Sequence, residues 1–189
     1  MRAIGVLILG LVVGCGTVSQ VQVHPEYEER FKESVLYLDI QVAAQESMPD
    51  PARTLWGTLS QRYANQHRDF IVEGMRMAPG EAQCKEGLQG VLWIHPALSE
   101  ESGSVHLQLE AALMTCDTET ILWSAVAEGN FTSQDAQLEA LRDSYEKEFG
   151  PETGPYVAPL FRMVRDTLGT LPYPKLTRDE DIFAKIALE

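Results

Sequence analysis

Apolar and polar residues alternate along the first part of this chain in a way that predicts a strand, a helix and a second strand. In the segment 35–42 every second residue is apolar, so one strand face would carry Leu36, Leu38, Ile40 and Val42. Asp50 followed by Pro51 is typical of a helix start, with Asp50 as the N-cap. That helix would present an apolar stripe made of Ala52, Leu55, Trp56, Leu59 and Tyr63. Phe70 begins a second apolar segment, and this order favours parallel pairing of the two strands.

Three further strands are predicted as an antiparallel meander. The apolar segments 90–94 and 104–114 are separated by the polar residues 99–103, which is typical of a hairpin connection. In the second segment every other residue is apolar, and the positions between them carry His106, Gln108 and Glu110. A turn over 116–120 then leads to a third strand over 121–127. One face of the meander is therefore expected to be open to solvent.

The last part of the chain changes to helical spacing. Ser133 is expected to cap a helix that ends at Gly150 and carries Leu138, Leu141 and Tyr145. A second helix is predicted over about 158–168, with an apolar stripe of Leu160, Phe161, Val164 and Leu168. The segment 171–176 must be extended, because each of its prolines restricts the residue before it. A final short helix over 178–189 would lie on the domain through Ile182, Phe183 and Ile186.

These elements together predict the fold class. We expect a single α/β (α+β) domain over residues 31–189, with a mixed sheet of about five strands and helices at its C-terminal end. Hydrophobic residues make up 44% of the chain and charged residues 23%, which are ordinary values for a globular domain. The net charge of −13 is a poor match for nucleic acid or for an anionic lipid surface, so we expect no nucleic-acid partner.

The first residues form a pattern of a different kind. Arg2 is followed by the apolar run 3–13, and Cys15 comes shortly after it. A basic residue, a short apolar run and small residues are the parts of a secretory signal peptide. A run of eleven residues is too short to cross a bilayer as a helix, which takes about 20. The sequence Val12-Val13-Gly14-Cys15 resembles the lipobox of bacterial lipoproteins, which implies removal of residues 1–14 and attachment of acyl chains such as palmitate to Cys15.

The lipobox implies a membrane anchor in a cell envelope. Several acyl chains on one residue hold a protein stably at a membrane, since two already suffice. Gly16 stands where an aspartate would favour retention in the inner membrane, so we expect the periplasmic side of the outer membrane. Residues 15–30 would form the lipidated N-terminus and a tether with a reach of about 50 Å at most. The alternative is an ordinary cleaved signal peptide followed by a chance cysteine.

The two other cysteines, Cys84 and Cys116, are expected to form a disulfide. An oxidising compartment such as the periplasm lets disulfides persist. If the predicted hairpin is centred near residue 100, the numbers of opposed residues add to about 200, and so do the numbers of these two cysteines. Closing a loop of this length would stabilise the fold by about 3–4 kcal/mol. The alternative is a pair of buried free thiols.

Residues that commonly carry catalysis or bind metals form no recognisable constellation in the sequence. The histidines have no metal-binding spacing with one another or with a cysteine; they are His24, His67, His95 and His106. We therefore expect a non-enzymatic protein with no catalytic residue, no metal and no cofactor. The acidic run 179–181 could bind a cation, although a solvated helix cap is the favoured interpretation. Tyr173, between two prolines, is a candidate partner contact, or it could fix the tail to the domain.

Beyond the lipobox, the element order and a few short motifs resemble known lipoprotein domains. The predicted strands and helices, with Asp117, Thr120 and Trp123 in the meander, look like a group of small periplasmic lipoprotein domains. That group contains the curli-secretion lipoprotein, the lipoprotein activators of penicillin-binding proteins and the TolB amino-terminal-like domains. The tail 171–181 and the Cys-x-Glu-Gly pattern at Cys84 resemble an uncharacterised family of small bacterial outer-membrane lipoproteins. This resemblance implies a fold and a compartment, and it carries over no catalytic residue.

The sequence thus favours a role in anchoring or assembly. We expect a lipid-anchored outer-membrane protein that faces the periplasm and serves as an accessory or scaffold subunit of an envelope assembly. It would bind an envelope protein partner through a sheet edge, the hairpin or the tail. The alternatives are a module that binds an envelope ligand such as peptidoglycan or lipid, and a hydrolase whose site the sequence does not reveal.

Overall fold

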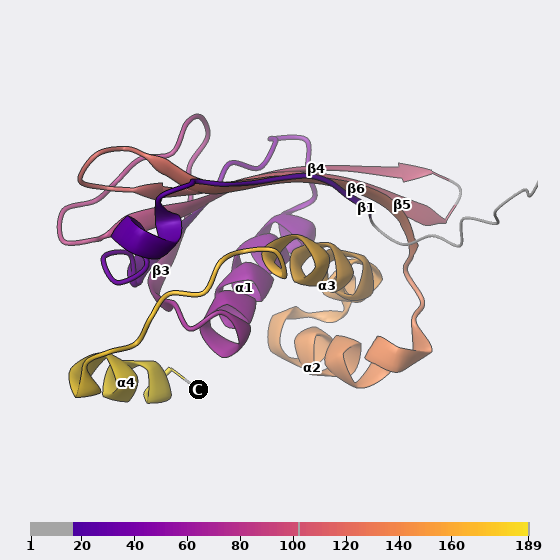
Figure 1. Cartoon of the computed structure of the whole chain (residues 1–189). Helices are drawn as coiled ribbons and strands as arrows, with labels where there is room; N and C mark the ends of the chain where they lie inside the picture. Colours follow the sequence, from indigo (N-terminus) through magenta and orange to yellow (C-terminus); the bar gives the residue numbers. More distant parts are fainter. Residues whose placement is uncertain (1–16, 102, 189) are drawn as a thin grey trace, which may run out of the picture.

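The computed structural model describes residues 17–101 and 103–188, which form one mixed sheet with helices on one of its faces (Figure 1). The sheet has six strands in the order β1-β6-β5-β4-β2-β3. The strands are β1 (Thr17–Val23), β2 (Tyr37–Val42), β3 (Ile71–Met77), β4 (Gly90–Glu101), β5 (Ser104–Thr115) and β6 (Ile121–Thr132). This arrangement confirms the predicted fold class, a single mixed α/β domain with C-terminal helices.

The parallel part of the sheet is built as the strand–helix–strand pattern predicts. The helix α1 (Asp50–His67) connects β2 to β3, and the two strands pair in parallel. The stripe residues Leu55 and Trp56 of α1 are completely buried. The helix begins one residue earlier than predicted, because Pro49 is the N-cap and Asp50 is the first helical residue. On the other side of β2, β4 pairs with it in parallel and continues into the antiparallel hairpin with β5.

The helices of the C-terminal half complete the core on the same side as α1. These are α2 (Glu139–Phe149) and α3 (Gly154–Leu168), and α3 packs against α1, β5 and β6. We call the sheet face that α1 and α3 cover the inner face and the opposite one the outer face (Figure 1). A short 3-10 turn precedes α2, and its N-cap is Asp135, whose side chain accepts a hydrogen bond from the Gln137 amide. The prediction that Ser133 caps this helix is therefore wrong.

The connection from β3 to β4 crosses the outer face of β2, and we call residues 78–89 the strap. Helix α1 covers one face of β2 and the strap covers the other, so this strand is buried on both sides. That explains why Asp39 and Gln41, which alternate with apolar residues, are 1% and 0% exposed. The Gln41 amide donates to the carbonyls of Ala78 and Glu81 and accepts from the Gln83 amide.

The strap is also bound covalently, since Cys84 and Cys116 form the expected disulfide with a Cα–Cα distance of 5.4 Å. The register that suggested this pair is different, however. Gly90 faces Thr115 and Glu101 faces Ser104 in the β4–β5 ladder, so opposed residue numbers add to 205. The backbone amide of Cys116 accordingly bonds to the carbonyl of Gln89, one position beyond that pair. Cys84 reaches Cys116 because the strap folds back over the outer face.

The sixth strand comes from the segment 15–30, which the sequence predicts as a tether. Thr17–Val23 forms β1 and pairs antiparallel with β6 at one edge of the sheet. The following turn of helix buries Tyr27 and Phe31 in the core. The prediction of a tether is therefore wrong from Thr17 onward, and the sheet has six strands instead of about five. The predicted signal peptide 1–14 and Cys15 lie outside the described residues.

Candidate functional site

The last helix, α4 (Asp179–Ile186), is attached to the domain through its charged residues. Asp181 is 3% exposed and Lys185 is 5% exposed, although both side chains are charged. The Asp181 carboxylate accepts two hydrogen bonds from the Arg178 guanidinium, at 2.8 and 2.9 Å, and one from the Tyr37 hydroxyl at 2.9 Å. Lys185 donates its Nζ proton to the carbonyl oxygen of Phe70 at 2.8 Å. Both attachments lie where β2 and β3 begin.

The electrostatics of this attachment are consistent with an ionised Asp181. The hydrogen bonds from Arg178 hold the pKa of Asp181 below its ordinary value of 3.8, with a smaller contribution from Tyr37 and against the effect of burial. The hydrogen bond to Asp181 in turn raises the pKa of Tyr37 above its ordinary value of 10.0. Charge-assisted hydrogen bonds of this kind are stronger than neutral ones. The polar side of α4 is therefore the side that faces the domain.

The apolar side of α4 faces solvent. Ile182, Phe183, Ile186 and the following Leu188 are 38%, 70%, 59% and 42% exposed, and we call these four residues the α4 face. Phe183 is the most exposed of the large apolar residues for which burial is described. The sequence prediction that Ile182, Phe183 and Ile186 pack onto the domain is wrong. In Figure 1, α4 lies apart from the helices that cover the inner face.

The two ends of the sheet differ in what they present. Thr17 faces Glu128, and Ser104 faces Thr132, so the start of β1 and the tip of the β4–β5 hairpin lie at one end. We call this the N-terminal end. The strands β2, β3 and β4 begin at the opposite end, where α4 is attached to Tyr37 and Phe70. We call this the α4 end.

Both edge strands carry a bulge. In β3 the register with β2 shifts, so Val72 and Gly74 face consecutive residues of β2 and Glu73 is left over. In β1 a similar shift leaves out Ser19, whose hydroxyl donates to the Val126 carbonyl. Bulges interrupt the row of free backbone groups to which another strand could add. Both edges are thus interrupted as templates for an added strand.

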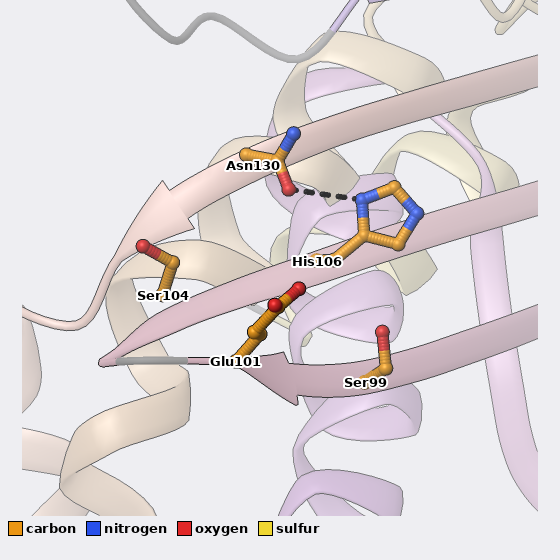
Figure 2. A pocket seen from close by; sticks show the side chains of 5 residues that line it. All are labelled: Ser99, Glu101, Ser104, His106 and Asn130. Carbon is orange, nitrogen blue, oxygen red and sulfur yellow. Dashed lines mark hydrogen bonds between the residues drawn. The ribbon is translucent and has the colours of Figure 1, made fainter.

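A polar depression lies on the outer face at the N-terminal end. Figure 2 shows its lining residues on neighbouring strands, and they are Ser99, Glu101, Ser104, His106 and Asn130. His106 Nδ1 is 3.0 Å from Asn130 Oδ1, and His106 Nε2 is 3.4 Å from Glu128 Oε1. The predicted wet face of β5 is thereby confirmed. These groups can hydrogen-bond hydroxyls or amides of a ligand. Ser99 faces His106 in the β4–β5 ladder, and the His106 ring bonds to Asn130.

The candidate metal-binding residues do not converge in the described part of the chain. No group of three or more His, Cys, Asp or Glu side chains there is arranged to hold a metal ion. Within the acidic run 179–181, Asp181 turns inward to Arg178 and the other two carboxylates are exposed. His95 and His106 lie on the outer face, each near a glutamate of a neighbouring strand.

Tyr173, the candidate partner contact, fixes the tail and is also accessible. Its backbone carbonyl accepts a hydrogen bond from the buried Tyr27 hydroxyl at 3.2 Å. Tyr173 as a residue is 51% exposed, and its ring centroid lies 4.7 Å from the guanidinium carbon of Arg68. Arg68 also donates to the Leu168 carbonyl at the end of α3. The backbone of the tail is thus held in place, while one face of the Tyr173 ring is free to contact other molecules.

The sequence contains a signal for the α4 attachment that the apolar pattern hides. Arg178, Asp181 and Lys185 are spaced by three and four residues, so they form a stripe as regular as that of the apolar residues. The helix therefore has a charged stripe and an apolar stripe, and either of them could pack against the domain. The polar one faces the domain because Tyr37 and the Phe70 carbonyl offer it hydrogen-bond partners.

Comparisons with known proteins leave the chain without a family assignment. No family model matches the sequence, and no curated protein sequence matches it. The chain is similar to a PelC dodecamer from Paraburkholderia phytofirmans at 14% identity and a TM-score of 0.47, over 84% of this chain and 98% of that one. It is also similar to the Xanthomonas campestris protein XCC0632, of the family model DUF330, at 13% identity and a TM-score of 0.37, over 83% of this chain and 94% of that one.

No helix among the described residues is both long and apolar enough to cross a membrane. The resemblance of the sequence to the curli-secretion group stays a prediction, because no family model and no curated sequence matches the chain. The lipid anchor also stays a prediction, because Cys15 lies outside the described residues.

Proposed function

We propose that this chain is a lipid-anchored lipoprotein of the outer membrane, on its periplasmic side, and that it is a non-enzymatic accessory subunit of an envelope assembly. The observation that carries the proposal is the position of the α4 face, which lies at the end of the sheet opposite to Thr17. An anchor at Cys15 would hold the N-terminal end at the membrane and direct the α4 face into the periplasm, toward a protein partner.

The short distance between anchor and domain supports this arrangement. Cys15 precedes Thr17, the first residue of β1, by two positions, so the lipid would be attached within about 7 Å of the sheet. A domain held that closely has a limited set of orientations at the membrane. The disulfide between Cys84 and Cys116 fits an oxidising compartment, which the periplasm is.

The anchor is tested by changing Cys15 to Ser in the full chain. We expect the protein to move from the membrane fraction to the supernatant, because the acyl chains that hold it would be missing. Sucrose-gradient fractionation of both membranes, followed by immunoblotting, measures the change. Gly16→Ala is the matched control and should leave the chain in the outer membrane. Retention of the Cys15→Ser chain in membranes would refute the proposal.

A second candidate function is binding of an envelope ligand. The polar depression at the N-terminal end favours a glycan, since it offers hydroxyl, amide, imidazole and carboxylate groups within one shallow area. A soluble peptidoglycan fragment titrated into the labelled protein would shift the NMR signals of His106 and Asn130 if this function holds. Unchanged signals would leave the accessory role as the better account.

A further inference from the structure

We propose that the α4 face is the docking surface for a partner protein with an apolar groove flanked by basic side chains. This inference deepens the proposed function and rests on it, because it names the partner's chemistry at the site that the accessory role requires. Helix α4 would enter the groove as a helix, with Phe183 at the centre of the contact. Amphipathic helices bind grooves in this way through residues spaced as Ile182, Phe183 and Ile186 are.

The exposed area on the α4 face indicates that it is covered in the working protein. From the exposed fractions of its four side chains, the face presents on the order of 400 Å² of apolar surface, which is as large as the main patch of many monomers. Hydrogen bonds of Asp181 and Lys185 hold the polar side of the helix against the domain, and the apolar side therefore faces solvent. A surface of this size on an anchored helix is typical of an interaction site.

A second copy of this chain is a poor occupant. Two α4 faces packed against each other would bury roughly 800 Å², below the ~1,200 Å² of stable specific interfaces. The bulges at Glu73 and Ser19 also disfavour extension of such a contact through paired sheet edges. A groove surrounds a helix on three sides and buries more area for each residue, so it suits a single short helix better.

A lipid surface is also a poor occupant. Helices that lie in a membrane interface carry Lys and Arg on their polar face. The exposed acidic residues at the start of α4 are Asp179 and Glu180, the exposed Arg178 is paired with Asp181, and Lys185 is turned to the domain. The anchor would in addition hold the opposite end of the sheet at the bilayer.

The charges around the α4 face specify the rim of the partner. Asp179 and Glu180 are exposed on the helix itself. Asp69 and Glu73 are exposed on the segment that receives it, next to Phe70 and near Tyr37. The side chain of Arg178 is 61% exposed, but its charge is compensated by the ion pair of its guanidinium with Asp181. An acidic rim around an apolar centre is complementary to an apolar groove edged by Lys and Arg, which would fix orientation and speed association.

The test begins with a photoreactive phenylalanine analogue at position 183 of the full-length, lipidated chain in cells. The matched control carries the same probe at Ile121, which is 55% exposed but lies on β6 outside the α4 face. We expect one adduct with a different protein from position 183 and none with that protein from position 121. The crosslinked protein is then purified, and its affinity for the purified chain is measured.

The affinities decide the chemistry of the partner. Phe183→Asp should weaken binding at least 100-fold, and Asp179→Lys with Glu180→Lys should weaken it about 10-fold, with a weaker salt dependence. Glu46→Lys, an exposed reversal on a distant loop, should change nothing. An adduct with a second copy or with lipid, no adduct at all, or an affinity that is indifferent to the charge reversals would overturn the inference. Fractionation of the same cells shows separately whether the chain is at the membrane, so failure of the proposed function is distinguishable.

Discussion

Asp39 shows how a single buried charge can join three segments of this protein. Its carboxylate is 2.5 Å from Lys85 Nζ on the strap and 3.9 Å from Arg76 on β3. Gly74 leaves the room that the carboxylate needs, because a Cβ atom there would lie 2.7 Å from Asp39 Oδ1. Burial of a carboxylate is costly unless a cation compensates it. The strand β2, the edge strand β3 and the strap therefore depend on one another at Asp39.

Lys85→Met should therefore destabilise the fold by about 2 kcal/mol, less than a fully buried pair would cost, because Arg76 remains and Lys85 is half-exposed. Urea unfolding measures the change. Lys175→Met is the matched control, since it removes an exposed ion pair with Glu33, and it should cost under about 0.5 kcal/mol. Equal effects of the two substitutions would contradict the role given to Asp39.

At the scale of elements, the strap and α4 are both parts of the fold that are held by polar or covalent contacts in place of an apolar face. The strap depends on Gln41, on the pair of Asp39 with Lys85, and on the disulfide. Helix α4 depends on two hydrogen-bonded charged residues. Such elements can be released separately from the core, because few buried apolar contacts hold them.

Replacing both Cys84 and Cys116 by Ser should lower the free energy of unfolding by about 3–4 kcal/mol, since the open chain has more conformations to lose. Urea unfolding of both proteins, with and without reductant, measures this. Reductant should bring the wild type down to the level of the variant and leave the variant unchanged. A wild type that is indifferent to reductant would contradict the prediction.

The attachment of α4 should depend on pH in a stated direction. The pKa of Asp181 is lowered, so its contribution is present above pH 3.8 and is lost as the pH falls through the lower value of the folded protein. The pKa of Tyr37 is raised, so its contribution is present below pH 10.0 and is lost at higher pH. NMR signals of residues 179–186 should report release at both extremes. Asp181→Asn should abolish the acidic transition, and a transition that persists would count against this carboxylate.

At the scale of the whole molecule, the fold separates two tasks along the strand direction. The N-terminal end carries the start of β1 and the hairpin, and the α4 end carries the exposed apolar side chains. The core between them is continuous, since α1 and α3 pack on the inner face across both halves of the sheet. Orientation at a membrane would therefore decide what the α4 face can reach.

A fluorophore can test this orientation on lipidated protein in vesicles. Attached at position 101 in the hairpin, it should be quenched strongly by quenchers carried on lipid headgroups, and attached at position 180 it should be quenched weakly. A Gly/Ser spacer of about 20 residues after Gly16, with a mean span of about 25 Å, should remove most of the difference. Equal quenching at the two positions without the spacer would refute the orientation.

The order of strands and helices could be predicted from the sequence because apolar spacing determines it locally. The buried polar residues of β2 could not be predicted, since the strap that covers them comes from farther along the chain; Gln41, for example, bonds to Glu81, which is 40 residues away. The prediction of a Cys84–Cys116 disulfide uses a hairpin register in which opposed residue numbers add to 200, whereas they add to 205 in the structure. The two cysteines still meet because the strap folds back. The outward turn of α4 depends on partners at Tyr37 and Phe70, which no local pattern contains.

The position of β1 has a mechanical consequence. If the lipid holds the chain at Cys15 while a partner pulls on α4, the force enters through Thr17 and runs along the strand axes. The hydrogen bonds between β1 and β6 are then loaded together, in shear, instead of opening one after another. A strand pair loaded in shear resists force far better than one that is pulled apart bond by bond. The β1–β6 pairing is therefore suited to transmit force from the membrane to an assembly.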